Sequence, residues 1–362
     1  MKKVIGFIGL GLIGGSIAKA LKKSDSSYYT VAYNRSREPL SLAVSEGIID
    51  KPAYEIDDSF SECDIIFLCT PVEYNSLYLS RIKPFIKQGC IVTDVGSVKG
   101  YIHKTVSELD MEDCFIGGHP MAGSEKTGYK SSSAIILENA FFAITPTEKT
   151  SKKSIDFYIS LIKEMGAVPI VTSPDRHDYA VAGISHVPHL IASSLVNLVK
   201  DNDTEDELMK SLAAGGFKDI TRIASSSAEM WSQICATNKD QISLLLGKYI
   251  DYLTQVRSYI DEGNKDAIGK MFVESKEYRD SISISTKGPV TRSHSFYCDI
   301  EDKEGSLNAV TLMLSENHIN IKNIEIIHNR EYRQGVLLVD FYDENSENSA
   351  RKLFAQNGYT IY

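Results

Sequence analysis

The chain has 362 residues, enough for two or three domains, and a formal net charge of −9 without a long basic run, so nucleic acid is not an expected partner. Hydrophobic residues make up 43% and charged residues 24%, which is typical of a soluble globular protein without a membrane anchor. An anionic small substrate stays possible, because a local group of basic side chains can oppose the global charge. The six Cys are scattered without a C-x-x-C motif, which predicts reduced thiols and a cytoplasmic location.

Residues 1–172 alternate apolar runs of strand length with helical segments. The runs are "KKVIGFIG", "TVAYNR", "CDIIFLCTP", "CIVTDVGSVK", "FFAITPT" and "AVPIVTSP". This alternation predicts an α/β domain with a parallel sheet and helices on both faces. The basic, apolar N-terminus also looks like a secretory signal peptide, but its ordered glycines favour a strand followed by a glycine turn.

Two further domains are predicted after the first. Residues 173–286 carry apolar residues at helical spacing, as in "DRHDYAVAGISHVPHLIASSLVNLVK", and contain no strand candidate, which predicts an all-helical domain. Residues 294–362 follow a polar linker and show the order strand, helix, strand, strand, helix, strand from "SFYCDIED" to "YTIY". That order is the ferredoxin-like arrangement.

Gly9, Gly11 and Gly14 form a G-x-G-x-x-G motif between a predicted strand and a predicted helix, with Leu12 and Ile13 inside it. The first glycine allows a tight turn, the second lets a pyrophosphate approach the main chain, and the third lets the helix pack on the strand. The helix N-terminus then offers N–H groups to the phosphates. The motif therefore predicts a Rossmann dinucleotide-binding domain.

The end of the second predicted strand bears on the choice of cofactor. NAD sites usually place Asp or Glu there, where the carboxylate accepts from the ribose 2′-hydroxyl. Here the residues are Asn34, Arg35 and Ser36. Arg35 can pair with a 2′-phosphate while Asn34 and Ser36 donate to it, which favours NADP, whereas stacking of Arg35 on the adenine would fit either cofactor.

The segment "GGHPMAGSEKTG", residues 117–128, is predicted to be a loop because it is Gly-rich and has no helical or strand period. It contains His119 and Glu125. A surface loop without a function is the simpler interpretation. A loop at the carboxyl end of a parallel strand, however, lies where ligands bind in this fold, and a His with a pKa of about 6.5 can exchange a proton there.

Five segments taken together resemble the prephenate dehydrogenase family over residues 1–285: "GLGLIGGSIAKAL", "DVGSVK", "GGHPMAGSEKTG", "RHDYAVAGISHVPH" and "GGFKDITRIASSSAEMW". The resemblance implies oxidative decarboxylation of prephenate to 4-hydroxyphenylpyruvate in tyrosine biosynthesis, with hydride transfer to NAD, the family's usual cofactor, or NADP. It also implies a homodimer formed through the helical domain.

The resemblance implies roles for three residues in particular. His119 matches the family's proton acceptor for the substrate hydroxyl, Ser97 matches a residue that contacts that hydroxyl and the nicotinamide, and Arg222 matches the holder of a substrate carboxylate. Further substrate-binding residues are expected to be His177, His189, Glu125, Trp231 and Lys218. The cofactor-binding residues are expected to be Gly9, Gly11, Leu12, Ile13, Gly14, Asn34, Arg35, Ser36, Thr70, Pro71 and Ser97.

Some of these positions leave alternatives open. Glu125 could orient a His, control access to the site or be a solvated loop acid, and Trp231 could equally belong to the core. His177, Asp178, His186 and His189 could be interpreted as a metal site. Pro188 interrupts that group and hydride transfer needs no metal, so no metal is expected, and His186 is expected to pack within the helix or to support the site.

The C-terminal segment resembles an ACT domain, a small module that binds amino acids in regulatory positions, through "EDKEGSL" at its first strand–helix turn. This resemblance implies tyrosine as an effector. Its expected binding residues are Glu304, Gly305, Ser306, Leu307, Asn320 and Ile321. A module that only adds dimer contacts is the alternative.

Three other functions compete with prephenate oxidation. Arogenate dehydrogenase differs only in the amino group of the substrate side chain. A non-catalytic amino-acid sensor is disfavoured because His119, Ser97 and Arg222 are all present. A hydroxyacid dehydrogenase of the 6-phosphogluconate type would use a Lys of the helical domain and would leave "HPMAG" without a purpose.

Overall fold

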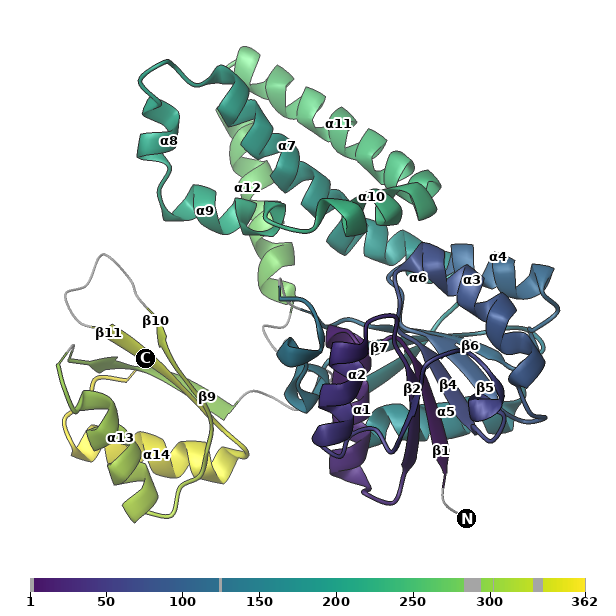
Figure 1. The fold of residues 1–362 in the computed structure, drawn as a ribbon. Coiled ribbons are helices and arrows are strands. Elements are labelled where there is room, and N and C mark those ends of the chain that lie inside the picture. Colours follow the sequence, from purple (N-terminus) through teal and green to yellow (C-terminus); the bar gives the residue numbers. More distant parts are fainter. Residues whose placement is uncertain (1–2, 124–125, 283–293, 302, 328–334, 362) are drawn as a thin grey trace. The chain divides into compact units, whose positions relative to one another are not determined.

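The computed structural model describes residues 3–123, 126–282, 294–301, 303–327 and 335–361. The chain divides into two compact units, Met1–Gly288 and Pro289–Tyr362, each of which is described by itself (Figure 1). The first unit contains a large sheet with its helices and a helical region; the second contains a small sheet with two helices.

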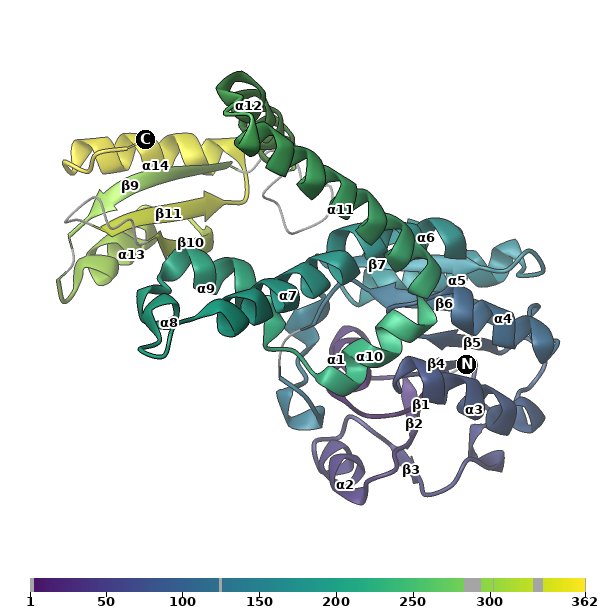
Figure 2. The same cartoon turned by 90° about the horizontal axis from the view of Figure 1, so that it is seen from above.

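The large sheet has the strand order β3-β2-β1-β4-β5-β6-β7-β8 (Figures 1 and 2). Neighbouring strands run parallel except β6 and β7, which are antiparallel. The chain reverses its direction of progress between β1 and β4, and in open α/β sheets ligands bind at such a switch point. The strands are β1 (Val4–Ile8), β2 (Tyr29–Tyr33), β3 (Lys51–Ala53), β4 (Ile65–Leu68), β5 (Ile91–Asp94), β6 (Phe115–Pro120), β7 (Phe141–Pro146) and β8 (Val168–Val171).

Helices cover both faces of this sheet because its central strands are apolar on both sides. Along β4, Ile65 and Phe67 belong to one core cluster and Ile66 and Leu68 to the other. The first cluster takes side chains from α1 (Leu12–Ser24), α2 (Arg37–Ser45) and α5 (Lys152–Glu164). The second takes them from α3 (Val72–Ile82) and α4 (Gly100–Glu108). The predicted Rossmann-like α/β fold is confirmed.

Two details of the sheet differ from the sequence prediction. The sheet is not wholly parallel, because β7 runs against β6. The predicted loop at residues 117–128 begins as a strand: His119 lies in β6 and pairs with Ala143 of β7. The two glycines before it serve close packing rather than a turn, since an added Cβ would lie 2.2 Å from Thr145 Oγ1 at Gly117 and 2.5 Å from Tyr158 Oη at Gly118.

The helical region follows β8, and its described residues contain no strand, as predicted. A π-helical turn separates α6 from α7 and ends two residues before Pro188, which lacks a main-chain N–H donor. The elements are α6 (Pro174–Val181), the π turn (Ala182–His186), α7 (Val187–Asn202), α8 (Leu208–Leu212), α9 (Gly215–Thr221), α10 (Ala228–Thr237), α11 (Lys239–Asp261) and α12 (Lys265–Ser281).

The second unit is a three-stranded antiparallel sheet with two helices on one face. Its elements are β9 (His294–Ile300), α13 (Ser306–Glu316), β10 (Ile321–Ile327), β11 (Gly335–Phe341) and α14 (Glu344–Gln356), and the strand order is β10-β11-β9. The buried core includes Phe296, Val339 and Phe354. In the described part of the last predicted strand, "YTIY", the pairing is a single bridge between Ile361 and Cys298, and Tyr362 lies outside the described residues.

Candidate active site

The glycine loop between β1 and α1 has the shape that a pyrophosphate needs. Gly9 has a φ of +99°, and a Cβ there would lie 2.6 Å from the carbonyl oxygen of Cys69. A Cβ on Gly14 would lie 2.3 Å from the carbonyl oxygen of Gly9, so α1 packs directly on the turn. A Cβ on Gly11 would meet none of the described atoms within 4 Å, which leaves its main chain open to a ligand at the N-terminus of α1.

The residues at the end of β2 are not equivalent. Asn34 Oδ1 accepts the main-chain N–H of Leu10 at 2.9 Å, and Asn34 Nδ2 donates to the carbonyl of Ser36 at 2.9 Å. Asn34 therefore links the end of β2 to the glycine loop, and both polar atoms of its side chain are bonded to main-chain groups. The Arg35 and Ser36 side chains are exposed at the tip.

The loop after β4 contributes Thr70 and Pro71, which were expected at the cofactor. Thr70 Oγ1 donates to Asn75 Oδ1 at 2.5 Å, and Pro71 precedes the first residue of α3. Val72 of α3 and Val98 of the loop after β5 pack with Ile234 and Trp231 of α10. The helical region thus contacts the start of α3, which follows β4, and the loop that follows β5.

A buried chain of hydrogen bonds links the sheet to the helical region. His119 Nδ1 lies 2.8 Å from His177 Nε2, and His177 Nδ1 lies 2.7 Å from Asp178 Oδ1. His177, on α6, is only 3% exposed. The Asp178 carboxylate also accepts the main-chain N–H groups of Lys99 at 2.8 Å and Gly100 at 2.7 Å, at the start of α4.

These contacts set the proton positions on both rings. A carboxylate only accepts, so His177 donates from Nδ1 to Asp178 and accepts at Nε2 from the Nδ1–H of His119. The lone pair of His119 is then on Nε2. Burial, with the nearby His177 and Lys99 as smaller causes, lowers the pKa of His119 well below 6.5, so the ring is a neutral proton acceptor at neutral pH.

Ser97 lies half-buried in the loop between β5 and α4. Two residues further on, Lys99 Nζ donates to the carbonyl oxygen of Gly118 at 2.6 Å. Gly118 immediately precedes His119 in β6. The Ser97 loop and the strand that carries His119 are therefore fastened together.

His189 and Trp231 form a second group near the first. Their rings stack with centroids 3.8 Å apart, and the ring of His186 meets the indole edge-on at 5.9 Å. His189 Nδ1 donates to the carbonyl of Ser185 at 2.8 Å. Trp231 Nε1 is buried and has no hydrogen-bond partner among the described residues, which marks it as a donor for a ligand.

Arg222 directly follows α9, and its charge lies close enough to help burial lower the pKa of His189. Its side chain is exposed, as is that of Lys218 on α9. The structure thus brings His119, His177, His189, Trp231 and Arg222 to the junction of the sheet and the helical region. Glu125 lies outside the described residues.

Three residues of this network had no separate role in the sequence analysis. Asp178 was considered only as part of a metal group, and Lys99 and Asn238 were not singled out. Asn238 Nδ2 donates to the Asp178 carbonyl at 2.9 Å and lies 3.1 Å from His186 Nδ1. His186 is therefore linked to Asp178 through the side chain of Asn238. The one local signal for Asp178 is its position directly after His177.

His119, His177 and Asp178 form a linear hydrogen-bonded chain, and no group of three His, Cys, Asp or Glu in the described part of the chain is arranged to hold a metal. A glycine loop shaped for a dinucleotide and a neutral His lie on the same sheet, and the charge of Arg222 lies close to His189 of the helical region. Together they define a nicotinamide-dependent dehydrogenase with an anionic substrate.

Comparison with known proteins gives the family. The family model for the prephenate dehydrogenase nucleotide-binding domain matches residues 17–171, and the model for the prephenate dehydrogenase dimerization domain matches residues 173–274. A curated prephenate dehydrogenase from Bacillus subtilis is 35% identical over 354 residues, which cover 97% of this chain and 95% of that protein. The chain belongs to the prephenate dehydrogenase family.

Two solved structures agree with this assignment. Prephenate dehydrogenase from A. aeolicus, in complex with hydroxyphenyl propionate and NAD+, has a TM-score of 0.74 and 31% identity over 78% of this chain and 99% of that one. Arogenate dehydrogenase from Synechocystis has a TM-score of 0.70 and 29% identity over 77% of this chain and 99% of that one. The chain is thus an NAD-dependent oxidoreductase of the prephenate dehydrogenase type. The predicted enzyme class is confirmed, and NAD is the one of the two expected cofactors that the comparison supports.

Proposed function

We propose that this chain oxidises prephenate through His119, which accepts the C4 hydroxyl proton at Nε2 while Asp178 and His177 hold its ring. The observation that carries the proposal is the hydrogen-bonded chain from Asp178 Oδ1 through His177 to His119 Nδ1. NAD+ held at the Gly9–Gly14 loop would supply the hydride acceptor for C4, and CO2 would leave from the ring to give the aromatic product. His177 thereby becomes a positioning residue, a different role from the substrate contact expected from the sequence.

The hydrogen-bonded chain also explains how His119 can hold the proton it receives. Protonation at Nε2 makes the ring cationic, and the cation gains from the Asp178 carboxylate through His177, as in other carboxylate–histidine relays. The carboxylate is already fixed by two main-chain N–H groups of α4. No reorganisation of the protein is therefore needed during the proton transfer.

The two carboxylates of prephenate need cationic or N–H donors, and the helical region supplies them. Arg222 offers a planar, permanently charged fork, and the buried Trp231 Nε1 has no hydrogen-bond partner among the residues that the structure describes. His189 holds the indole by stacking against it. We assign Arg222 and Trp231 to the substrate carboxylates, with Lys218 adding positive potential from α9.

Cofactor and substrate preference are best tested together. We expect the highest kcat/KM for prephenate with NAD+ in a steady-state assay that crosses prephenate and arogenate with NAD+ and NADP+. Arogenate as the better substrate would make this chain an arogenate dehydrogenase, like the Synechocystis relative. Absence of turnover in all four combinations would favour the amino-acid sensor.

NADP is the second candidate cofactor, and Arg35 is the observation that favours it. Asn34 is bound to the main chain, so only Arg35 and Ser36 remain to meet a 2′-phosphate. No carboxylate replaces them at residues 34–36 to accept from a ribose hydroxyl. The tip of β2 therefore tolerates NADP even where NAD is the working cofactor.

A homodimer accounts for the apolar surface of the helical region. The helical run Pro174–Asn202 is 29 residues long and apolar enough, by length and composition, to cross a membrane, yet only 28% of its most apolar window is buried. Phe272, Val273 and Leu253 are exposed on α12 and α11. Since residues 173–274 match a dimerization domain, we assign these surfaces to a second copy of the chain.

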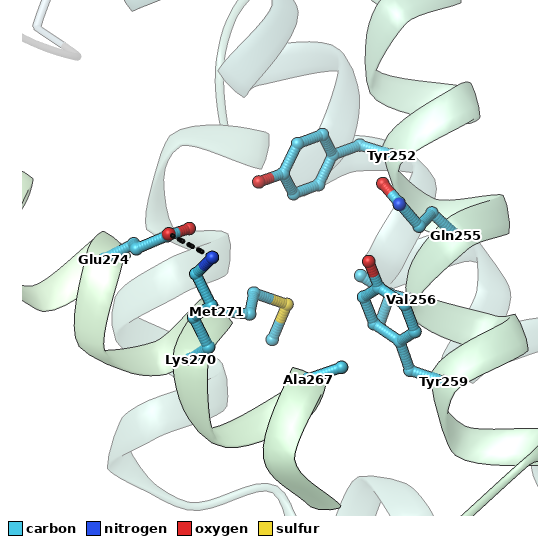
Figure 3. Close-up of a pocket in the computed structure, with 8 residues that line it drawn as sticks. All are labelled: Tyr252, Gln255, Val256, Tyr259, Ala267, Lys270, Met271 and Glu274. Atoms are coloured by element: carbon cyan, nitrogen blue, oxygen red, sulfur yellow. Dashed lines mark ion pairs between the residues drawn. The ribbon is translucent and has the colours of Figure 1, made fainter. Parts of the chain in front are cut away.

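The same two helices also form a shallow groove, shown in Figure 3. Tyr252, Val256 and Tyr259 of α11 face Ala267 and Met271 of α12 across it, and Lys270 pairs with Glu274 at its side. We assign this groove to the dimer contact as well. Light scattering should then give about twice the 40.2 kDa mass of one chain.

The second unit is proposed to be an ACT-like regulatory module that binds tyrosine. The order of its helices and strands and the β10-β11-β9 sheet, extended by the bridge at Ile361, support a ferredoxin-like arrangement. Gly305, with a φ of +87°, begins α13, and Asn320 directly precedes β10. The candidate ligand residues remain Glu304, Gly305, Ser306, Leu307, Asn320 and Ile321.

A further inference from the structure

Lys99 is the most deeply buried cation of the described chain. Its side chain is 0% exposed, and Nζ lies 2.5 Å from Asp94 Oδ2 and 2.6 Å from the carbonyl oxygen of Gly118. Asp94 also accepts the main-chain N–H of Gly118 at 3.2 Å through its other oxygen. The ammonium and its carboxylate therefore hold both polar main-chain groups of the residue before His119.

The main-chain N–H of Lys99 binds the carboxylate that holds the ring of His177. Lys99 N–H donates to Asp178 Oδ1 at 2.8 Å, the oxygen that also receives the Nδ1–H of His177 at 2.7 Å. Lys99 thus contacts Gly118, which precedes His119 in β6, and Asp178, which follows His177 in α6. Gly118 and Asp178 are about sixty residues apart in the sequence, and one residue joins them.

We propose that Lys99 is a positioning residue that fixes the distance and orientation between His119 and His177, so that Nε2 of His119 points at the substrate hydroxyl. Burial of an ammonium and a carboxylate costs free energy that an apolar pair of similar volume would avoid. A role in positioning His119 would explain why the Lys99–Asp94 pair is buried at this place. The proposal rests on the assignment of His119 as proton acceptor.

The charge of Lys99 adds a second effect in the same direction. His119 is faced by His177 of α6, His186 of the π turn and Lys99, each of which lowers its pKa in addition to burial. The Asp94 and Asp178 carboxylates flank Lys99. Without the ammonium, His119 would meet more negative surroundings and would become protonated at a higher pH.

The test is the pH dependence of kcat and KM for Lys99→Met in the full-length chain. We expect kcat at neutral pH to fall at least tenfold, the KM for prephenate to change less than threefold, and the acid limb of the kcat profile to move to higher pH. A merely structural lysine would lower stability without moving that limb. Unchanged kcat and an unchanged limb in folded Lys99→Met would overturn the proposal.

Lys22→Met is the matched control. Lys22 Nζ likewise bridges a carboxylate and a carbonyl, at 2.7 Å from Asp50 Oδ2 and 2.7 Å from the Tyr28 carbonyl oxygen, but at the end of α1 remote from the histidines in the chain. It should lower the thermal midpoint while kcat and the acid limb stay as in the parent. A limb that moves equally in both variants would contradict a specific role for Lys99.

A second variant covers the case in which Lys99→Met does not fold because Asp94 is left unpaired. Lys99→Met with Asp94→Asn removes both charges, and it should fold, lose at least tenfold in kcat and keep its KM. Normal kcat in this double variant would overturn the proposal. If His119→Asn abolishes turnover while the Lys99 variants are normal, only this inference fails; if His119→Asn turns over normally, the proposed function fails.

Discussion

The pyrophosphate-binding groups at the cofactor end are main-chain atoms of one continuous segment, Gly9–Gly14, whereas the functional groups at the substrate end are side chains from several separate elements. A pyrophosphate needs only an accessible main chain and a helix N-terminus. The three glycines within this six-residue segment provide the first, and the start of α1 provides the second. A proton acceptor with a fixed lone pair needs partners that the local sequence does not contain. His119 obtains its ring partner, His177, from α6, and Lys99 of the loop before α4 holds the carbonyl of the neighbouring Gly118.

This difference predicts which kinetic parameter a substitution at each end of the site should change. A substitution at the cofactor end changes shape and is felt as weaker binding. A substitution at the substrate end changes a proton position or a charge and is felt in the chemical step or in the binding of one functional group. The following variants separate the two kinds of failure.

The largest effect is expected for His119→Asn, which keeps a polar group near the hydroxyl but removes the proton acceptor. Loss of a general base typically costs about 10²–10⁴ in rate, so kcat should fall by that factor with little change in KM. His318→Asn is the control, because His318 is exposed and has a φ of +55°, which Asn tolerates well. Near-normal turnover in His119→Asn would remove His119 from the chemistry.

The next effect is expected for Arg222→Ala. Loss of a hydrogen bond between charged partners costs roughly 1.5–3 kcal/mol, so KM for prephenate should rise about 10- to 100-fold while kcat falls much less. Arg222→Lys keeps the charge but loses the planar fork, so its KM for prephenate should lie between those of the parent and Arg222→Ala. An unchanged KM in Arg222→Ala would make this residue structural.

The effect expected of the second unit is of similar size, and it should be lost when that unit is removed. Coupling between an effector site and an active site is commonly about 1–3 kcal/mol, so saturating tyrosine should raise the apparent KM for prephenate roughly 5- to 150-fold. A chain that ends at Lys287 should keep its activity and lose this response. Equal inhibition of the truncated chain would place tyrosine in the active site instead.

The smallest effect is expected for Arg35→Ala, because the side chain is exposed and its ion pair would be screened by water. A pair of this kind contributes roughly 0.2–1 kcal/mol, so KM for NADP+ should rise by up to about fivefold more than KM for NAD+. Arg37→Ala is the control, since Arg37 lies over the ring of Tyr54 at 5.4 Å. Equal losses for both cofactors would favour stacking on the adenine.

The sequence was most informative where a function depends on a short segment. The glycine loop, the alternation of strands and helices, the strand-free helical region and the family motif around His119 could all be predicted, because each is a local pattern. The strand at Phe115–Pro120 could not. Its glycines resemble a loop, and only the partner strand Phe141–Pro146 and the side chains beneath it show why glycine is required there.

Lys99 and Asp178 show the same limit at the substrate end. A lysine is ordinarily a surface residue, and nothing near Lys99 in the sequence reveals that the Gly118 carbonyl will close over its ammonium. Asp178 has meaning only once the start of α4 delivers two N–H groups to it. Such residues become visible when the fold brings distant segments together.

In the proposed mechanism, Asp178 and His177 hold His119 as a neutral ring with its proton on Nδ1 and its lone pair on Nε2. Nuclear magnetic resonance of the ¹⁵N-histidine-labelled protein at pH 7, with His119→Asn to assign the signals, measures this directly. We expect the long-range ¹H–¹⁵N pattern of His119 to be that of a neutral ring protonated only at Nδ1. A proton on Nε2, in either a neutral or a doubly protonated ring, would contradict it.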